Sequence, residues 1–458
     1  MGLSNHLTCR NGLFDVKNRS YLSARSPQQV LVSGFALLIA VGALLLWLPI
    51  SVTEGRSLSF HDALFTATSA ATVTGLVVAD TGRHFSLFGQ LVLLVLIQAG
   101  GIGFMTMTTW FALAFGKKIS FKERLILKES FNFQSTEGIV RLIRKVFFYS
   151  LVIEAAGTLL FAVHWMADMP AGKALYHGLF HAVSIFNNAG FDLFGGLSSY
   201  VGDYFFNTVA MVLIFLGSAG FIVLSDLIDY PASRKLSLHS KVVLSFSGLL
   251  LVLGGVVIFI FEYTNELSMG ALNDGHKLLA SFFQSTSLRS SGTSTVNIES
   301  LRQATQFFMV IMMFIGAAPG STGGGIKVTT FAIMAAAVLA MIRGKEDVDL
   351  FRSRISKDLV YKAITVTFIA LFLVGSATMA LCLVENQPFL SVLFETTSAF
   401  GTTGFSAGVT QHLGGFGKTV IILLMIAGRL GPFTIAMALR SKTRKELYRY
   451  PEGKIILG

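Results

Sequence analysis

Long apolar runs recur along the chain, and each is about as long as a helix that crosses a bilayer. A transmembrane helix needs about 20 consecutive apolar residues, whereas a barrel strand shows about ten residues of alternating polarity. The runs are continuous, so the pattern predicts an all-α integral membrane protein. We expect eight spans, at roughly 30–49, 86–115, 146–165, 204–228, 242–261, 304–342, 363–384 and 417–439.

Composition supports this interpretation and excludes several function classes. Of the 458 residues, 53% are hydrophobic and 13% are charged, which is about half the charged fraction of soluble domains. Two cysteines, Cys9 and Cys382, cannot form a disulfide framework or a thiolate metal site. The sequence contains no phosphate-binding or dinucleotide-binding glycine motif. A membrane-embedded enzyme would need converging acids, bases or metal ligands, so it is the remote alternative, and no organic cofactor is expected.

The distribution of basic residues predicts the orientation of the spans. With the N-terminus inside, 27 of the 36 Lys and Arg residues fall on the inner side, 7 fall outside, and Lys327 and Arg429 lie within apolar runs. Inner loops of membrane proteins are enriched in Lys and Arg, so both termini are predicted to be cytoplasmic. No cleavable signal peptide is apparent before the first run. The net charge of +11 is then mostly an orientation signal, and nucleic acid is not an expected partner.

Four shorter apolar stretches lie in the predicted outer segments, at 60–71, 175–186, 278–288 and 389–400. Stretches of about 10 to 14 residues are too short to cross and are typical of re-entrant helices. Each leads to a glycine that is preceded by a phenylalanine ten residues earlier and by a small hydroxyl residue six residues earlier. The glycines are Gly75, Gly190, Gly292 and Gly404, preceded by Phe65, Phe180, Phe282 and Phe394 and by Ser69, Ser184, Thr286 and Ser398.

This spacing predicts four tandem units, each made of a span, a short re-entrant helix, a glycine-containing extended segment and a second span. Four such units around one axis would direct the extended segments to one central pore. We place the units at 30–116, 117–230, 231–343 and 344–440, between a cytoplasmic N-terminal segment at 1–29 and a cytoplasmic tail at 441–458. The second unit includes a basic inner loop at 117–145.

The extended segments are nearly free of charge and rich in small and hydroxyl-bearing residues. They comprise Thr72, Val73, Thr74 and Gly75; Asn187, Asn188, Ala189 and Gly190; Arg289, Ser290, Ser291 and Gly292; and Gly401, Thr402, Thr403 and Gly404. A ring of backbone carbonyls can replace the hydration shell of a monovalent cation, and glycine allows the positive φ values that turn carbonyls toward one axis. No ring of four carboxylates occurs at these positions, which favours potassium over divalent cations.

The run 304–342 is too long for one span. As a single helix it would measure roughly 58 Å at 1.5 Å per residue, nearly twice the hydrocarbon thickness of about 30 Å. It is interrupted by Gly316, Pro319, Gly320, Gly323, Gly324 and Gly325, which favour a loop over a helix. A loop at membrane depth belongs inside the protein or in a wet cavity.

The other second spans contain G-x-x-G steps, for which two interpretations stay open. The steps are Gly100 with Gly103, Gly217 with Gly220 and Gly428 with Gly431, and Gly316 stands at the corresponding place in the third unit. Small residues let membrane helices approach closely, or they could line a pore.

Several ionisable side chains lie inside or next to apolar runs, where they are functional-site hypotheses by default. Arg429 lies mid-span, and Arg289 is predicted to hydrogen-bond carbonyls behind the glycine segment, because facing a cation would repel it. His177 and His181 could share one helix face as metal ligands, but no third ligand is apparent nearby. We interpret them as amphipathic residues at the outer end of the second short helix. Glu154 lies near the inner end of the third run, where we interpret it as a paired or interfacial carboxylate, and the sequence assigns no role to it.

The fourfold pattern, with one filter glycine per unit in a single chain, resembles the Trk/Ktr/HKT superfamily of potassium transporters over about residues 30–440. Eight spans without an extra N-terminal pair resemble most the KtrB-type ion-translocating subunits of bacterial Ktr systems. The resemblance rests on T-V-T-G-L at 72–76, N-N-A-G-F at 187–191, R-S-S-G-T at 289–293 and T-T-G-F at 402–405. The third segment departs from the family pattern at Ser290, Ser291 and Thr293.

The resemblance implies a multi-pass potassium uptake subunit of the bacterial inner membrane. It assigns the four glycines to a selectivity filter, with K+ at the carbonyls of Thr72, Asn187, Ser290 and Thr402. It also implies that the loop 316–326 is an intramembrane gate beneath the filter, whereas the alternative is a passive linker. Arg429 would project into the pore, raise the barrier for a cation and interact with the gate, whereas the alternative is a structural hydrogen bond to loop carbonyls.

The resemblance also implies partners. It predicts a homodimer and a cytoplasmic ring of nucleotide-binding regulatory subunits of the KtrA type, for which the inner loops 117–145 and 343–362 are candidate docking surfaces. Na+ is a candidate activator, because sodium dependence is common in the Ktr group. A less selective Na+/K+ channel or symporter of the same superfamily is the alternative, although Gly75 favours K+, since plant members with serine at the first filter position lose K+ preference.

Overall fold

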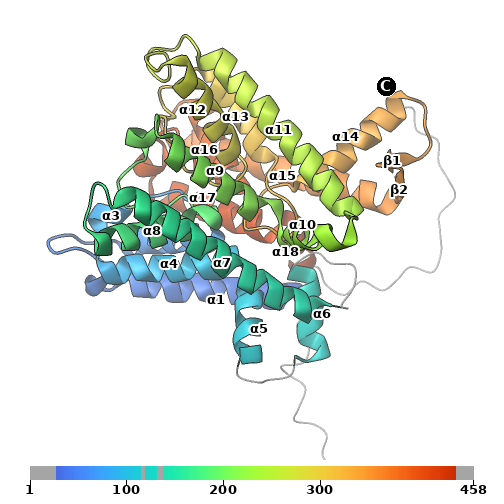
Figure 1. The fold of residues 1–458 in the computed structure, drawn as a ribbon, viewed down its shortest axis with the longest axis horizontal. Coiled ribbons are helices and arrows are strands. Elements are labelled where there is room, and N and C mark those ends of the chain that lie inside the picture. The colour runs from blue at the N-terminus through green and yellow to red at the C-terminus, as the bar shows by residue number, and fades with distance from the viewer. Residues whose placement is uncertain (1–26, 115–118, 131–137, 440–458) are drawn as a thin grey trace, which may run out of the picture.

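The computed structural model describes residues 27–114, 119–130 and 138–439 (Figure 1). These residues are mostly helical, in agreement with the apolar runs. The predicted N-terminal segment 1–29 lies almost entirely outside the described residues, as do the tail 441–458 and part of the basic loop 117–145.

Four long helices begin the four predicted units. They are α1 (Pro27–Trp47), α7 (Ile139–Trp165), α11 (Leu238–Glu262) and α15 (Lys357–Val384), and each is long and apolar enough to cross a membrane. Large apolar side chains cover their outer faces, and Leu37, Leu159, Leu249 and Phe368 are 63%, 61%, 60% and 74% exposed. Such a surface would drive association in water, whereas it is the expected outer face in lipid.

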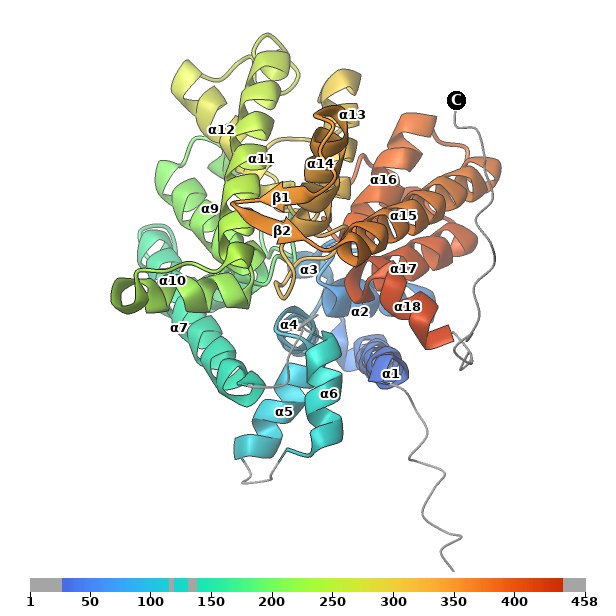
Figure 2. The same cartoon turned by 90° about the vertical axis from the view of Figure 1, so that its right-hand side faces the viewer.

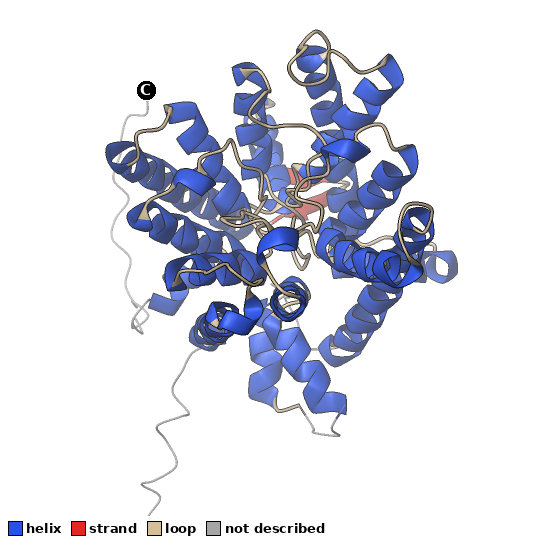
Figure 3. Ribbon diagram, turned by 90° about the vertical axis from the view of Figure 1, so that its left-hand side faces the viewer, coloured by secondary structure: helices blue, strands red, loops and turns tan. Residues whose placement is uncertain are grey.

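A short helix follows each long helix and packs against it. These helices, which lie where the short apolar stretches predict them, are α2 (Phe60–Thr72), α8 (Ala171–Phe186), α12 (Asp274–Ser287) and α16 (Phe389–Gly401). In Figure 3 the helices surround a central group of loops. The short helices lead at their C-terminal ends into the glycine segments, and a helix C-terminus carries partial negative charge that favours a cation.

The second span of every unit is broken into two helices, whereas the sequence predicts a break only in the third. The pairs are α4 (Leu87–Gly101) and α5 (Phe104–Ala114), α9 (Tyr204–Ala219) and α10 (Phe221–Ser233), α13 (Gln303–Phe314) and α14 (Val328–Ile342), and α17 (Gly415–Leu430) and α18 (Pro432–Leu439). The prediction of unbroken spans is therefore wrong at 86–115, 204–228 and 417–439.

Glycine explains the three unpredicted breaks. Gly103, Gly220 and Gly431 follow the first helix of each pair and have φ values of 94°, 90° and 84°. A right-handed helix has negative φ, and glycine adopts these positive values without a Cβ clash. The chain therefore changes direction at each of them, and the axes of α9 and α10 differ by 103°.

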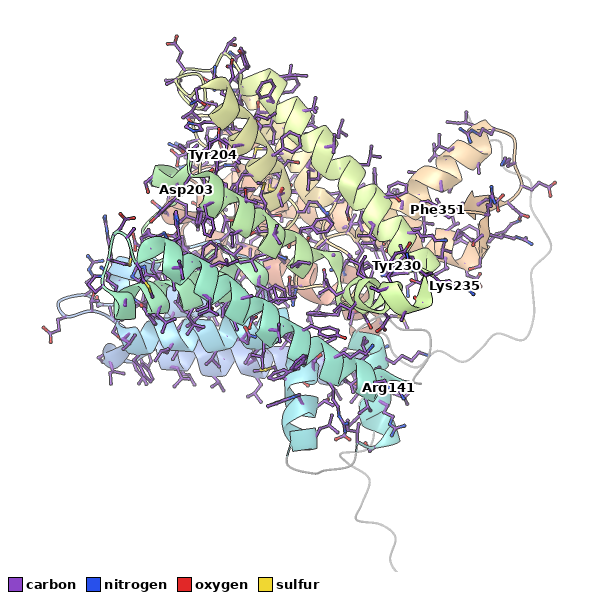
Figure 4. All side chains as sticks on the ribbon, in the orientation of Figure 1. Arg141, Asp203, Tyr204, Tyr230, Lys235 and Phe351 are labelled. Carbon is purple, nitrogen blue, oxygen red and sulfur yellow. The ribbon has the colours of Figure 1, made fainter. Side chains whose placement is uncertain are left out.

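Shorter elements connect these helices. Outer segments contain α3 (Thr81–His84) and the 3-10 turns Pro49–Ser51, Ser198–Tyr200 and Thr410–His412. At the other end, α5 and α6 (Phe121–Ser130) project together from the body (Figure 1), and β1 (Val348–Leu350) pairs antiparallel with β2 (Ser353–Ile355) between α14 and α15 (Figure 2). Figure 4 places Arg141 and Lys235, from predicted inner loops, toward the opposite end from Asp203 of a predicted outer loop.

The core is built around the short helices, and its phenylalanines show a register shift in the third unit. Phe65, Phe180 and Phe394 are fully buried at the predicted positions. In the third unit Phe283 is fully buried and Phe282 is only partly buried. The fully buried phenylalanine of the third unit therefore lies one position after Phe282, the residue at the repeated spacing.

Candidate ion pathway

The four predicted glycines lie in one closed ring. A Cβ atom added to Gly75 would lie 2.6 Å from the Ala189 carbonyl oxygen and 3.1 Å from the Gly190 Cα. Each of the other glycines has the same relation to the next segment: a Cβ atom on Gly190 would lie close to Ser291 and Gly292, one on Gly292 close to Thr403 and Gly404, and one on Gly404 close to Thr74 and Gly75. A side chain at any of these glycines would collide with the neighbouring backbone, so the ring closes only with glycine.

The residue two positions before each ring glycine is left-handed in all four segments. Val73, Asn188, Ser290 and Thr402 have φ values of 58°, 61°, 101° and 47°. The ring glycines are also left-handed, with φ values of 91°, 69°, 67° and 89° in chain order. A non-glycine residue in this region costs about 1–3 kcal/mol and persists only where its surroundings enforce it. The same strained backbone therefore occurs in four unrelated sequences.

Hydrogen bonds to the short helices hold the backbone of these segments. The amides of Thr74, Ala189 and Thr403 donate to the carbonyls of Ser69, Ser184 and Ser398, at 2.8, 2.7 and 2.9 Å. The hydroxyl oxygens of Ser69 and Ser398 also accept from the amides of Gly75 and Gly404, each at 3.1 Å. The predicted small hydroxyl residues thus bind the glycine segments from behind.

The third segment is held one residue differently. Ser291 donates its amide to the Ser287 carbonyl at 2.9 Å, and the Ser287 hydroxyl donates to the Thr293 carbonyl at 2.6 Å. Thr286, the predicted hydroxyl residue, instead donates to the Phe282 carbonyl within its own helix. The residue at the repeated spacing therefore does not hold the third segment, and the anchoring residue Ser287 lies one position nearer to its glycine.

Several carbonyl groups of the glycine segments accept no hydrogen bond from the described residues, and four of them stand at one register. These four belong to the residue immediately before each glycine, Thr74, Ala189, Ser291 and Thr403. The carbonyls assigned by the resemblance stand at two other registers, three residues before the glycine for Thr72 and Asn187 and two before it for Ser290 and Thr402. The Thr402 carbonyl also accepts the Ser290 hydroxyl at 3.0 Å.

The loop between α13 and α14 lies directly against the glycine segments. The Gly324 amide donates to the hydroxyls of Thr402 and Ser290, at 2.8 and 3.2 Å. Asn188 donates its Nδ2 to the Thr322 hydroxyl at 2.7 Å. Three of the four left-handed residues thus contact this loop, and the fourth, Val73, has no polar side chain to offer.

Other contacts hold the loop at its ends and sides. Gly316 donates its amide to the Ile326 carbonyl at 2.7 Å, which closes the base of the loop. Phe221 donates to the Gly320 carbonyl at 2.9 Å, and Gly325 donates to the Gly428 carbonyl at 3.2 Å. The loop, which also contains Pro319 and Gly323, is therefore held between the broken second spans of the second and fourth units.

Two basic side chains bind carbonyls of this loop. Arg429 donates from Nη1 to the Thr322 carbonyl and from Nη2 to the carbonyls of Gly100 and Gly101, the latter at 3.0 Å. Lys327 donates to the Gly323 carbonyl at 2.6 Å. Arg429 thus makes the structural hydrogen bond to loop carbonyls that was the alternative to a barrier role, and both roles are compatible with its position.

Arg289 and His181 differ from their predicted surroundings. Arg289 is 2% exposed, and its Nε and Nη2 find no acceptor among the described residues, so the predicted clamp onto filter carbonyls is not formed by these two atoms. His181 is fully buried between Trp165 and Phe194 and is not an amphipathic surface residue. Among the described residues no group of three His, Cys, Asp or Glu could hold a metal ion.

Comparison with known sequences identifies the family. A family profile described as TrkH, cation transport protein, matches residues 10–447. The chain belongs to the TrkH family. It is 42% identical over 434 residues to the Ktr system potassium uptake protein B of Bacillus subtilis, covering 94% of this chain and 97% of that protein.

Two further relatives and one solved structure agree with the family assignment. The chain is 36% identical to the Ktr system potassium uptake protein B of Vibrio alginolyticus, over 98% of this chain and 99% of that protein. It is 38% identical to the potassium/sodium uptake protein NtpJ of Enterococcus hirae, over 94% of this chain and 97% of that protein. The crystal structure of the potassium transporter TrkH from Vibrio parahaemolyticus has the same fold, with a TM-score of 0.73, 18% identity and coverage of 92% of this chain and 86% of that one.

In this TrkH-family chain the G-x-x-G glycines serve helix packing. A Cβ atom on Gly100, Gly217 or Gly428 would collide with the carbonyl of Ala71, Phe186 or Phe400, respectively, each four residues before a ring glycine. Gly316 instead abuts the Gly324 carbonyl of the loop. The packing interpretation therefore accounts for the first glycine of each step, and the second glycine breaks the span.

Four polar residues on the short helices α2, α8, α12 and α16 were not predicted as part of the site. Each directly follows the fully buried phenylalanine: Thr66, His181, Gln284 and Glu395. Three of them bind the chain just after the ring glycine: His181 accepts the Leu193 amide at 3.4 Å, Gln284 donates to the Ser294 hydroxyl at 2.6 Å, and Glu395 accepts the Ala407 amide at 3.2 Å. A polar residue directly after the phenylalanine was the available signal in three units, and in the third unit it follows Phe283 in place of Phe282.

Proposed function

We propose that this chain is a potassium uptake transporter whose four glycine segments form one selectivity filter. The observation that carries the proposal is the closed ring of four glycines with four unbonded carbonyls beside it. Such carbonyls can replace the water that a monovalent cation loses on entry, and the C-terminal ends of four short helices lead into the same region. The names of the relatives from Bacillus and Vibrio, potassium uptake proteins, support K+ as the substrate.

The proposed architecture is four tandem units around one central pore. Eight spans, four of them broken, and four re-entrant helices would be divided among units at 30–116, 117–230, 231–343 and 344–440. Both termini would be cytoplasmic in a bacterial inner membrane, which the concentration of basic residues in inner loops supports.

We assign one ion-binding level to the carbonyls of Thr74, Ala189, Ser291 and Thr403. These four stand at one register and accept no hydrogen bond from the described residues. The carbonyls of Thr72, Asn187, Ser290 and Thr402 stand one or two residues earlier and would belong to levels further along the pathway. Free carbonyls in equivalent positions are what an ion level requires.

The loop 316–326 would act as the gate. It contacts the filter segments of three units through Asn188, Ser290 and Thr402, so it obstructs the end of the filter. Arg429 and Lys327 hold its carbonyls and add positive charge, which would oppose a cation in the closed state. Opening then requires the loop to leave its contacts with the filter hydroxyls, whereas a passive linker would have no such requirement.

The partners are proposed from the family alone. The transporter would be a homodimer regulated by a cytoplasmic ring of nucleotide-binding subunits of the KtrA type, docked on the inner loops 117–145 and 343–362, with Na+ as a candidate activator. A less selective Na+/K+ transporter is the second candidate, and the printed name of the Enterococcus relative, a potassium/sodium uptake protein, supports it.

Cation flux into liposomes tests the filter. Purified protein is reconstituted, and K+, Rb+ and Na+ uptake are compared for the parent, Gly75→Ser and Gly404→Ser. We expect K+ and Rb+ flux in the parent and Na+ permeation in both variants, because a side chain at either glycine displaces the neighbouring segment. Gly248→Ser, in α11 with no atom within 4 Å of an added Cβ, is the matched control. Equal Na+ and K+ flux in the parent would favour the second candidate.

A further inference from the structure

Glu154 lies in the middle of α7, buried at 4% exposure. Its Oε2 accepts the Gln98 amide at 2.9 Å, and its Oε1 accepts the Asn187 amide at 2.9 Å. None of the ion pairs among the described residues involves it. It is therefore not an interfacial residue near the inner end of a span but a carboxylate at membrane depth with neutral partners.

A carboxylate at this depth carries a free-energy cost. An ionisable residue within a membrane span costs several kcal/mol relative to an apolar one, and it normally marks a functional site. Both partners of Glu154 are side-chain amides from other elements, Gln98 of α4 and Asn187 at the C-terminal end of α8. The carboxylate therefore joins the first unit to the start of the second filter segment.

Asn187 is fixed on every side. Its Nδ2 donates to the side-chain Oε1 of Gln98, to the Glu154 carboxylate and to the Val183 backbone carbonyl, each at 2.9 Å. Its Oδ1 lies against Gly101, where a Cβ atom would collide with it. Nδ2 thus faces three acceptors, whereas Oδ1 is buried without a hydrogen-bond partner among the described residues, so the Glu154 carboxylate is one of the contacts that orient the Asn187 amide.

The next residue reaches the gate loop. Asn188 is left-handed and donates to the Thr322 hydroxyl, and the Thr322 carbonyl accepts from Arg429. Arg429 in turn binds the carbonyls of Gly100 and Gly101, which follow Gln98 by two and three residues. The contacts thus form a closed circuit from Glu154 through the filter and the gate loop and back to the helix that holds Gln98.

We propose that Glu154 is a positioning residue that fixes the second filter segment through Asn187 and so couples the filter to the position of the gate loop. The inference rests on the proposed function of this segment as a filter. Two adjacent residues make the two connections: Asn187 binds Glu154, and Asn188 binds Thr322 of the loop. Movement of the loop therefore displaces Asn188 through Thr322, whereas Glu154 holds the preceding residue, Asn187, in place. The contact between Glu154 and Asn187 thus preserves the conformation of the second filter segment when the loop moves.

A swap of the two partners tests the proposal. Glu154→Gln removes the carboxylate, Gln98→Glu adds a second one, and the double variant Gln98→Glu/Glu154→Gln restores one carboxylate and one amide. Cells that lack their own K+ uptake express each variant, and K+ and Na+ uptake are measured in the same cells. We expect the K+/Na+ uptake ratio to fall about tenfold in Glu154→Gln, which corresponds to about 1.4 kcal/mol, and to return in the double variant.

Glu262→Gln is the matched control, because Glu262 is also fully buried and accepts only neutral donors, including Arg302 N at 3.0 Å and Asn265 Nδ2 at 2.6 Å, but lies in an outer segment. Its uptake ratio should equal the parent's. An unchanged ratio in folded Glu154→Gln overturns the proposal, as does a double variant as defective as the single one. Equal K+ and Na+ uptake in the parent would instead overturn the proposed potassium selectivity and favour the less selective Na+/K+ transporter.

The link to the gate has its own measurement. Thr322→Val removes the hydroxyl that Asn188 binds, and residues that act through one connection give non-additive effects. We expect Glu154→Gln combined with Thr322→Val to lower the uptake ratio no further than the stronger single variant. Additive losses would overturn the coupling. Should Glu154→Gln fail to accumulate, the double swap carries the first test, since it is expected to behave as the parent.

Discussion

Arg429 binds the carbonyl of Thr322 through its guanidinium, and through the same group it binds the carbonyls of Gly100 and Gly101. A side chain from the last unit thus ties the loop of the third unit to the broken span of the first. The planar fork of arginine suits this, because its donors diverge toward separate acceptors.

Arg429→Ala should raise K+ flux. The change removes the positive charge near the loop and the charge-assisted hydrogen bonds, each of which contributes about 1.5–3 kcal/mol, so a rise of about tenfold is expected. Rb+ uptake into liposomes measures it. Arg429→Lys separates the two causes: flux like that of Ala identifies the anchoring hydrogen bonds, and flux like the parent's identifies the charge. An unchanged rate in stable Arg429→Ala would leave only a passive structural role.

Deletion of Gly323–Gly325 should make transport constitutive. These residues carry the amides that bind Thr402, Ser290 and the Gly428 carbonyl, so the shortened loop cannot reach the filter. Uptake is compared with and without the activating partner. A deletion of three residues in the exposed turn at 54–56, which is predicted to lie outside, is the control for the effect of shortening the chain. If the deletion variant stays as tightly regulated as the parent, the loop is a linker.

Gly428→Ala should destabilise the protein. An added methyl group would collide with the Phe400 carbonyl, and overpacking of this kind costs about 1–3 kcal/mol. The midpoint of thermal unfolding in detergent should fall by several degrees. Gly375→Ala, within α15 and with no atom within 4 Å, should leave the midpoint unchanged or raise it, because alanine favours helix by up to about 1 kcal/mol. Similar midpoints for both variants would contradict close packing at Gly428.

Glu395→Gln should weaken both stability and selectivity. The carboxylate accepts from Ser406, Ala407 and Thr410, and a glutamine turns an amide donor toward one of these donors. A buried donor left without an acceptor costs about 1–3 kcal/mol. Thermal unfolding and the K+/Na+ flux ratio measure the two effects. Glu299→Gln, at an exposed neighbouring carboxylate, is the control, and a parent-like flux ratio for Glu395→Gln would exclude a role behind the filter.

The repeat and the short helices could be predicted because their signals are local. A run of apolar residues too short to cross, followed by glycine, marks the ends of α2, α8, α12 and α16 within a few residues. Periodicity of the glycines then brings the four segments together without knowledge of any contact. The loop 316–326 could also be predicted, from the length of the run 304–342 and from its proline and glycines, and the family resemblance added only its role as a gate.

The breaks at Gly103, Gly220 and Gly431 could not be predicted in the same way. A single glycine lowers the stability of a helix by about 1 kcal/mol. Burial of the apolar run in lipid easily offsets this loss, so each run is predicted as one unbroken helix. At Gly220 the loop 316–326 packs against the bend through the carbonyls of Pro319 and Gly320, and hydropathy does not reveal such a contact. The interaction of Glu154 with Asn187 also depends on elements that hydropathy alone cannot place side by side.

The shift in the third unit was hidden for a related reason. Phe282 and Phe283 are both phenylalanine, and Thr286 and Ser287 both carry a hydroxyl, so either register satisfies the pattern. The distinction lies in one residue of chain between helix and glycine, which only the hydrogen bond from Ser291 to Ser287 reveals.

Four unlike stretches of a single polypeptide close the ring. In an assembly of identical subunits every substitution appears on all sides at once, so a small change in pore shape is multiplied. Here a single substitution changes one quarter of the pore lining, and the shifted anchor of the third segment is such a change already present. Selectivity can therefore evolve in small steps, through changes in one of the four glycine segments, while the other three segments continue to bind the ion.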